Sequence, residues 1–462
     1  MEFRKEEEEL LFSEHNEFNF ESKLIRNDSK NIYNRLRSIV DDAEFVAQVY
    51  SLMPTLALVA NERCGSWYID LIQPLQTPAY SAYFKSTDGH MRAWDLSVRR
   101  NNLHLVPIIA KHGGCIIVDS TRKGKKIPDA LSKTIPIWCC AVNRMIARLQ
   151  DTADWDLSFY SPPAAVSRSE HAQIEALMDS FVDKLERSGL STSIANGCLK
   201  KPLRPLWYTP ESYQALLDSP PQWEEMPFYP IICLSASEAI PSGYQSRPGY
   251  LYVQGSGDDQ EAWSMGLTAN LFWQHKDTIL DNRDTCEQRV LDTVAKQQWI
   301  DKPEYARIEP TCISIGNYGS GNQLMDFDLI INCDPLKHAE CQGPNYLHVP
   351  IPEGKKGQIV FASAIDKVIE FAKEAIMKQK RILVHGRTGK DYAVGFVLSL
   401  LIHYYDTEGQ LYQKEKPRVD KQLIQRHLVR IIAHWEKASP SRTTLKRVNT
   451  HFMSHSTKSV DN

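Results

Sequence analysis

The stretch that most constrains the fold is ILVHGRTGKDYAVG at residues 382–395, because it predicts a β-strand, a short glycine-marked loop and a helix in direct succession. In such a unit the backbone amides of the loop and of the first helical turn point toward one place, and the helix dipole adds positive potential there. An anion fits that place. We therefore expect the loop to bind phosphate through His385, Gly386, Arg387, Thr388, Gly389, Lys390 and Asp391.

Strand-like runs alternate with helical patterns on both sides of this stretch, which predicts an α/β chain. At 462 residues the chain is too long for one typical core, so we expect two domains. The first, residues 1–320, is an α+β domain of unassigned topology, and the second, residues 321–456, has a central and mostly parallel sheet. In the first domain we expect strands at 66–72, 113–121, 230–233 and 249–257, and helices at 28–60 with a break at Pro54, at 130–149 and at 170–189.

The second domain resembles the dual-specificity protein phosphatases. Their motif is His-Cys, two residues, Gly, two residues, Arg, and this chain keeps His385 and Gly389 but has Gly386 and Tyr392 at the Cys and Arg positions. Hydrolysis by that family needs the thiolate nucleophile and a bidentate arginine. The resemblance therefore implies a phosphate cradle that does not hydrolyse its ligand. The alternative is a domain with a purely structural role.

Acidic residues follow a predicted strand in the string VQGSGDDQEAW, residues 253–263. Hard carboxylate oxygens at a strand end suit Mg²⁺, and we expect Asp258 and Asp259 to bind it; an acidic helix N-terminus explains the same residues equally well. Carboxylates could also accept a proton or stabilise a cation during a reaction. Our candidate catalytic residues are Asp258, Asp259, Glu261, Asp88 and Asp119.

Hydroxyls and cations follow another predicted strand in VDSTRKGK, residues 118–125. The string is weakly similar to the donor loops of phosphoribosyltransferases, although a basic turn on the surface fits almost as well. We expect donor phosphate to be bound here and by the loop before Asp258, through Ser120, Thr121, Arg122, Lys123, Lys125, Ser256 and Gly257.

The net charge of −3 argues against indiscriminate binding of nucleic acid. Basic residues are nevertheless clustered, and lysines and arginines on one face can bind a phosphate backbone whatever the overall charge. Scattered surface charge is the alternative for any single cluster. The candidate residues for binding an RNA partner are Asn61, Arg63, His90, Arg99, Arg100, Lys200 and Lys201.

Taken in order along the chain, NERCGSWY, STDGH, VDSTRKGK and QGSGDD followed by the phosphatase-like loop are similar to the family of initiator-tRNA 2′-O-ribosyl phosphate transferases of fungi and plants. The resemblance implies transfer of 5-phosphoribosyl from phosphoribosyl pyrophosphate to the 2′-hydroxyl of the adenosine at tRNA position 64, with Mg²⁺, release of pyrophosphate and exclusion of that tRNA from elongation. The alternative function is a phosphatase-like pseudoenzyme that binds a phosphorylated ligand and catalyses no reaction.

The cysteines that lie in apolar runs indicate a reducing compartment. No apolar stretch approaches the roughly 20 residues that cross a bilayer, and the start MEFRKEEEELLF is charged rather than signal-like. We expect a cytoplasmic protein without a membrane partner and without an obligate protein partner.

Overall fold

A computed structural model describes residues 28, 30–70, 79–86, 94–150, 152, 154–187, 199–218, 221–296, 303–323, 325–338, 343–352, 354–413, 417–435 and 437–454. Backbone contacts divide the chain into two compact units. The first comprises Met1–Leu96, Leu105–Leu185 and Ser191–Gln297, and the second comprises Ser97–His104, Glu186–Leu190 and Gln298–Asn462. We describe each unit by itself.

The first unit is built on a parallel five-stranded sheet with the order β2-β1-β3-β5-β4. Its strands are β1 (Ala57–Asn61), β2 (Tyr80–Ala82), β3 (Cys115–Asp119), β4 (Leu203–Tyr208) and β5 (Tyr229–Ser235). From β1 the chain leads to β2 on one side and then crosses to β3 on the other. The carboxyl ends of β1 and β3 therefore mark the point where the strand order reverses, which is where open α/β sheets bind ligands.

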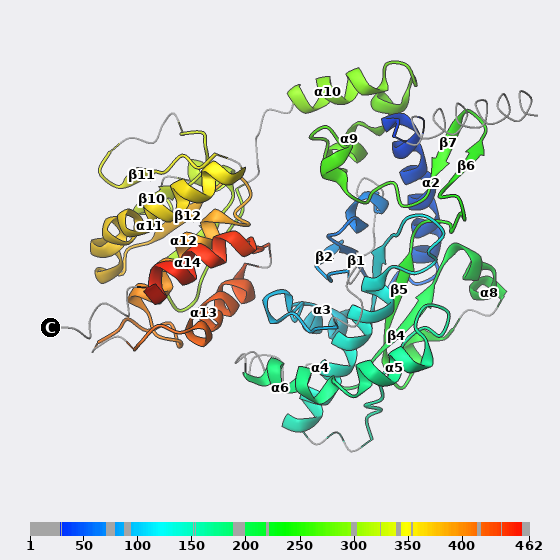
Figure 1. Cartoon of the computed structure of the whole chain (residues 1–462), viewed down its shortest axis with the longest axis horizontal. Helices are drawn as coiled ribbons and strands as arrows, with labels where there is room; N and C mark the ends of the chain where they lie inside the picture. Colours follow the sequence, from blue (N-terminus) through cyan, green and yellow to red (C-terminus); the bar gives the residue numbers. More distant parts are fainter. Residues whose placement is uncertain are drawn as a thin grey trace, which may run out of the picture. The chain divides into compact units, whose positions relative to one another are not determined.

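Helices cover this sheet, and β1 and β3 are buried along their whole length, as is typical of parallel strands. The helix α2 (Ile32–Ser51) buries an apolar face, including Leu36 and Ile39, in the same core as β1 and β3. Along its other side α2 contacts β7 of an antiparallel hairpin (Figure 1). The other α-helices and strands described in this unit are α3 (Leu105–His112), α4 (Ile135–Leu149), α5 (Arg168–Glu175), α6 (Met178–Arg187), α8 (Tyr213–Asp218), β6 (Tyr244–Arg247), β7 (Tyr250–Val253), α9 (Ala269–Leu280) and α10 (Cys286–Lys296).

The second unit has its own five-stranded sheet, with the order β11-β10-β12-β9-β8. All neighbouring strands are parallel except β8 and β9, which are antiparallel. The strands are β8 (Tyr305–Arg307), β9 (Ile313–Gly316), β10 (Leu329–Asn332), β11 (Tyr346–His348) and β12 (Ile382–His385). The helices are α11 (Gly354–Met377), α12 (Tyr392–Tyr404), α13 (Lys421–His434) and α14 (Arg442–Ser454), and α12 is buried over most of its length between α11 and α13.

The prediction of an α/β chain with a mostly parallel second sheet is confirmed, and the first unit has the parallel topology that the sequence left unassigned. Two predicted elements are wrong. Residues 65–68 form a short 3-10 helix instead of a strand. In the region 28–60, α2 ends at Ser51, close to the predicted break at Pro54, but the residues after the break form β1 instead of helix.

The single helix expected over 170–189 is also wrong, because it is interrupted between α5 and α6. At the interruption the Leu177 amide bonds to the Ile174 carbonyl three residues back, which tightens the turn and rotates Leu177 outward. Leu177 is 37% exposed, although the periodicity places it in the apolar stripe. None of the helices in the described ranges is long and apolar enough to cross a membrane.

Candidate active site

Asn61 and Asp119 end the two strands at which the order of the first sheet reverses, and their side chains are joined there. The Asn61 Nδ2 atom donates to Asp119 Oδ2 at 2.8 Å. The other carboxylate oxygen accepts from the Cys64 thiol at 3.1 Å and from the Ser120 amide at 2.8 Å. Both Asn61 and Asp119 are completely buried, so Asp119 is an internal anchor with four neighbouring donors.

Burial affects the pKa values of both Asp119 and Cys64. Burial raises the pKa of Asp119, while Arg63 and the hydrogen bonds from Cys64 and Asn61 act in the opposite direction. Burial and then the charge of Asp119 raise the pKa of the Cys64 thiol well above its usual value. Cys64 is therefore a protonated donor and not a nucleophile.

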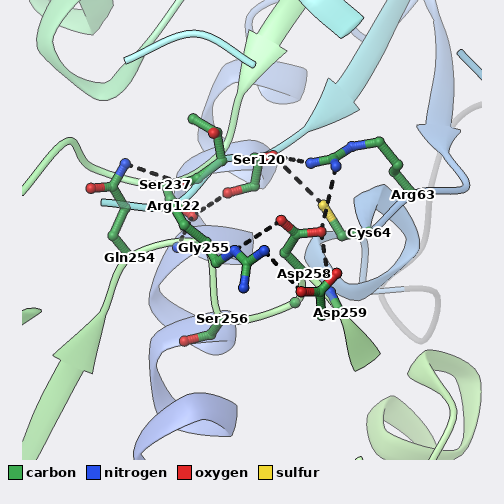
Figure 2. A network of polar contacts seen from close by, with 12 residues as sticks. Arg63, Cys64, Ser120, Arg122, Ser237, Gln254, Gly255, Ser256, Asp258 and Asp259 are labelled. Atoms are coloured by element: carbon green, nitrogen blue, oxygen red, sulfur yellow. Dashed lines mark hydrogen bonds and ion pairs between the residues drawn. The ribbon is translucent and has the colours of Figure 1, made fainter. Parts of the chain in front are cut away.

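Two arginines and three carboxylates alternate from this anchor toward solvent. Figure 2 shows the outer four of these residues, Arg63, Asp258, Arg122 and Asp259. Arg63 lies 3.5 Å from both Asp119 Oδ2 and Asp258 Oδ1. On its other side Asp258 contacts Arg122 Nε at 3.2 Å, and Arg122 Nη2 contacts Asp259 at 2.8 Å. The Asp119 side chain is fully buried, whereas those of Arg122 and Asp259 are 51% and 62% exposed. The open end of this charge ladder is thus accessible to a ligand.

The loop that carries Asp258 is held by side chains far away in the sequence. The Gly257 amide donates to Tyr68 Oη at 2.8 Å, and Arg35 of α2 donates to the Ser256 carbonyl at 3.1 Å. A Cβ atom at Gly255, whose φ is +67°, would lie 2.6 Å from the Thr121 carbonyl oxygen, so this loop and the loop after β3 touch through their backbones. Asp258 is therefore presented from a fixed loop.

Beneath the ladder lies a chain of hydroxyl groups that the sequence analysis missed. The Ser120 and Ser237 Oγ atoms are 2.6 Å apart, and Ser237 donates to the Asp42 carboxylate of α2. Tyr252 donates to the other Asp42 oxygen at 2.7 Å. Burial raises the pKa of Asp42 to about 8, so at neutral pH it retains a proton in most molecules. A carboxylate on the apolar face of α2 is the one sequence signal that could have revealed this network.

Gln254 was missed as well, although it fixes the loop after β3. Its Nε2 atom donates to the Thr121 and Lys125 carbonyls, and its Oε1 atom accepts from the Gly124 and Ile240 amides, at distances from 2.8 to 3.1 Å. One buried amide therefore uses all four of its hydrogen-bonding positions to close the loop. The position of Arg122 in the ladder depends on that closure.

The predicted metal ligands Asp258 and Asp259 do not form a ready-made metal site. Both carboxylates face arginine, and within the described ranges no group of three or more His, Cys, Asp or Glu side chains could hold a metal ion. Because Mg²⁺ is usually held by one or two carboxylates together with substrate phosphates, the residues present fit an ion that arrives with its ligand rather than a resident one.

Other predicted site residues lie around the ladder or away from it. Ser256 and Thr121 are buried, Lys123 is exposed, and Lys125 pairs with Asp129 at 2.8 Å. Glu261 is exposed on a short 3-10 helix, and among the described residues no hydrogen bond or ion pair connects it to the ladder.

Of the residues expected to contact tRNA, Asn61 is buried in the anchor and Arg63 belongs to the ladder. Lys200 and Lys201 precede β4 and so lie at the amino-terminal edge of the sheet, opposite the carboxyl ends. Arg100, in the second unit, donates to Ser439 Oγ at 3.0 Å. Asp88, His90 and the Arg99 side chain lie outside the described residues.

In the second unit, residues 386–391 form the loop between β12 and α12 that the sequence predicted. Gly389 has a φ of +67°, and an added Cβ would lie 2.7 Å from the Gly316 carbonyl oxygen, so only glycine fits there. Its own carbonyl accepts from Trp435 Nε1 at 3.0 Å. The loop borders a pocket of about 370 Å³ together with Cys333 and Asp334.

The two cations of this loop, both at the pocket, have different surroundings. Arg387 forms a bidentate pair with the buried Asp334 at 3.0 and 3.3 Å, whereas Lys390 is exposed at the pocket. The His385 ring is buried beside His338 and is not among the pocket-lining residues, and burial lowers its pKa to about 3. Thr388, Lys390 and the backbone amides are therefore the groups best placed to bind an anion.

The position of the phosphatase nucleophile is closed to a larger side chain. A Cβ atom at Gly386 would lie 2.8 Å from Cys333 Sγ, which is closer than ordinary van der Waals contact. Burial raises the pKa of the Cys333 thiol, and this thiol donates to the His385 carbonyl at 3.0 Å. Cys333 is thus a packed, protonated neighbour and not a displaced nucleophile.

Comparison with known proteins agrees with both units. The family descriptions "Rit1 N-terminal domain" and "Rit1 DUSP-like domain" match residues 25–295 and 345–452. The chain belongs to the Rit1 family. An uncharacterized protein of Schizosaccharomyces pombe is 35% identical over 92% of this chain and 94% of its own length. The tRNA A64-2′-O-ribosylphosphate transferase of Saccharomyces cerevisiae is 32% identical over 94% of both chains.

Solved structures similar to this Rit1 family chain cover about a third of it. A mouse putative dual specificity phosphatase shares 15% identity over 34% of this chain and 91% of its own, with a TM-score of 0.26. A human tyrosine phosphatase-like serine/threonine/tyrosine-interacting protein shares 16% identity over 33% and 97%, with a TM-score of 0.25.

Proposed function

We propose that this chain transfers 5-phosphoribosyl from phosphoribosyl pyrophosphate to the 2′-hydroxyl of the adenosine at position 64 of initiator tRNA, which releases pyrophosphate and excludes that tRNA from elongation. The observation that carries the proposal is the charge ladder from Asp119 to Arg122 at the switch point of the first sheet. It is supported by membership of the Rit1 family and by the activity named for the Saccharomyces cerevisiae relative.

The reaction forms a bond between the tRNA 2′-oxygen and C1 of the donor ribose while the bond from C1 to pyrophosphate breaks. Arg122, at the open end of the ladder, would bind the departing pyrophosphate through its exposed guanidinium. Asp258, next to it, would accept the proton of the 2′-hydroxyl. Mg²⁺ that enters with the donor would neutralise charge on the leaving group.

Asp119 and Asn61 would act indirectly in this proposal. Both are fully buried, and Asp119 is saturated with donors, so neither reaches a substrate. They instead hold Arg63, which contacts Asp258. We therefore assign them as positioning residues.

The cradle of the second unit is proposed to bind a substrate phosphate through Thr388, Lys390 and the loop amides. The nucleophile that the phosphatases carry would have no task in the reaction, because the attacking hydroxyl belongs to the tRNA. This accounts for Gly386 and Tyr392 at the two positions that phosphatase chemistry needs.

The test incubates the purified chain with initiator tRNA, Mg²⁺ and phosphoribosyl pyrophosphate labelled in its 5-phosphate. We expect label on the tRNA, none on a tRNA with a 2′-O-methyl group at A64, and a loss of about 100-fold or more in rate for Asp258→Asn. Asp277→Asn, at an exposed position of α9, is the matched control with unchanged rate. Absence of label with a folded protein would favour the phosphatase-like pseudoenzyme.

A further inference from the structure

The first unit also has a cavity, of about 810 Å³, at the carboxyl edge of the same sheet as the charge ladder. Its walls include Trp207, the residue before the last in β4, and residues of the segment Gly124–Asp129, which follows β3. Since β3 and β4 both run parallel to β5, their carboxyl ends are at one edge. No role has been assigned to this cavity so far.

One loop joins the cavity to the ladder. Arg122, at its start, pairs with Asp258 and Asp259, whereas Lys126, near its end, lines the cavity. Gln254 binds the loop at Thr121, just before Arg122, and at Gly124 and Lys125, just before Lys126, and so fixes both positions at once. A ligand in the cavity would therefore be separated from one in the ladder by a single rigid loop.

The walls suit a flat ring. The Trp207 indole is held by a hydrogen bond of 2.8 Å from Nε1 to the Leu131 carbonyl, so the orientation of its partly exposed ring is fixed before any ligand binds. Ile127, Pro162 and Pro163 supply further apolar wall. Stacking of a nucleobase on an aromatic side chain contributes about 1–3 kcal/mol and needs no particular base sequence.

The charges do not suit pyrophosphate. Lys126 pairs with Glu211 at 2.6 Å and Lys125 pairs with Asp129 at 2.8 Å, so each cation at the cavity is next to a carboxylate. Carboxylates repel polyphosphate but accept hydrogen bonds from base amino groups and ribose hydroxyls. Phosphoribosyl pyrophosphate carries no base, and therefore the apolar wall would serve the RNA rather than the donor.

We infer that the cavity between Trp207 and Pro163 binds one nucleotide of the acceptor RNA through its base, beside the loop that holds the donor. This inference rests on the proposed function and adds the place at which the acceptor is recognised. Bases of RNA that are splayed out are commonly bound by stacking on aromatic side chains with polar groups at the base edge.

The test fills the cavity from an exposed wall residue. Ala164→Trp places an indole in the cavity, and Ala172→Trp at an exposed position of α5 is the matched control. Isothermal titration calorimetry measures the binding of adenosine 5′-monophosphate and of ribose 5-phosphate, which lacks the base. We expect the unmodified protein and Ala172→Trp to bind the nucleotide at least 10-fold more tightly than the sugar phosphate.

For Ala164→Trp we expect nucleotide binding to fall at least 10-fold while ribose 5-phosphate binding stays unchanged. Equal affinity of the unmodified protein for the two ligands, no binding of the nucleotide, or nucleotide binding that Ala164→Trp leaves intact would each overturn the inference. The labelled-donor assay separates the two proposals. Base-dependent binding without transfer of label would reject the transferase function and support the cavity as a nucleotide site. Transfer of label without base-dependent binding would support the transferase function and reject the cavity as a nucleotide site.

Discussion

The substitution Gln254→Met tests whether one side chain organises the active-site loop. Methionine matches glutamine in length and keeps the buried volume, but it cannot replace the four hydrogen bonds to Thr121, Gly124, Lys125 and Ile240. Gly124 is exposed, so its amide can donate to water in the variant. The hydrogen bonds that are lost without replacement are therefore the three to Thr121, Lys125 and Ile240. At about 1 kcal/mol each, their loss destabilises the closed loop by about 3 kcal/mol.

Hydrogen exchange followed by mass spectrometry measures this change directly. A loss of about 3 kcal/mol corresponds to roughly a hundredfold faster exchange, because 1.4 kcal/mol is tenfold. We expect the increase in peptides that cover residues 121–126 and the Ile240 amide, together with weaker donor binding because Arg122 is no longer held. Gln245→Met, at an exposed position of β6, is the matched control. Equal exchange in the two variants would refute the assigned role of Gln254.

Three further outcomes are expected. Because burial raises the pKa of Asp42 to about 8, the native state keeps a proton that the unfolded state releases, and the free energy of unfolding falls as pH rises toward 8. Asp42→Asn removes this titration, so the urea midpoint of the variant minus that of the unmodified protein should increase between about pH 5 and pH 8. A difference that stays constant over this range would contradict the raised pKa of Asp42. Gly386→Cys should not hydrolyse para-nitrophenyl phosphate, since the new Cβ meets Cys333 Sγ at 2.8 Å, and turnover would show that the cradle can accept a nucleophile. Lys390→Ala should weaken binding of inorganic phosphate several-fold in calorimetry relative to Lys373→Ala, an exposed control on α11; equal affinities would exclude the cradle as the anion site.

Local signals in the sequence were sufficient for much of this structure. The apolar run ILVH favours a strand and the two glycines after it favour a loop, and both signals lie within a few residues of the structure they predict. The predicted strand, loop and helix correspond to β12, the cradle and α12. The acidic and basic strings after β3 and β7 were found in the same way, because polar residues directly after a buried strand have few structural roles there.

The network that holds those strings could not be found by the same reasoning. Ser237 meets Asp42 across 195 residues and Gly257 meets Tyr68 across 189, and nothing local marks such partners. The same limit explains the error at residues 65–68, where tertiary contacts of Trp67 and Tyr68 decide the backbone and the apolar run alone favours a strand. The pairing of Arg387 with the buried Asp334 could not be found either, because Asp334 follows a different strand.

The charge ladder has a consequence for how the protein is made. It draws on Arg63 after β1, Arg122 after β3 and Asp258 after β7, and its supports reach back to Arg35 in α2. Contacts this distant in the chain form late, after the closure of long loops. When only β1 and β3 have left the ribosome, the chain contains the anchor residues Asn61 and Asp119 but neither Asp258 nor Asp259. A first unit that is truncated before these two carboxylates should therefore have no activity.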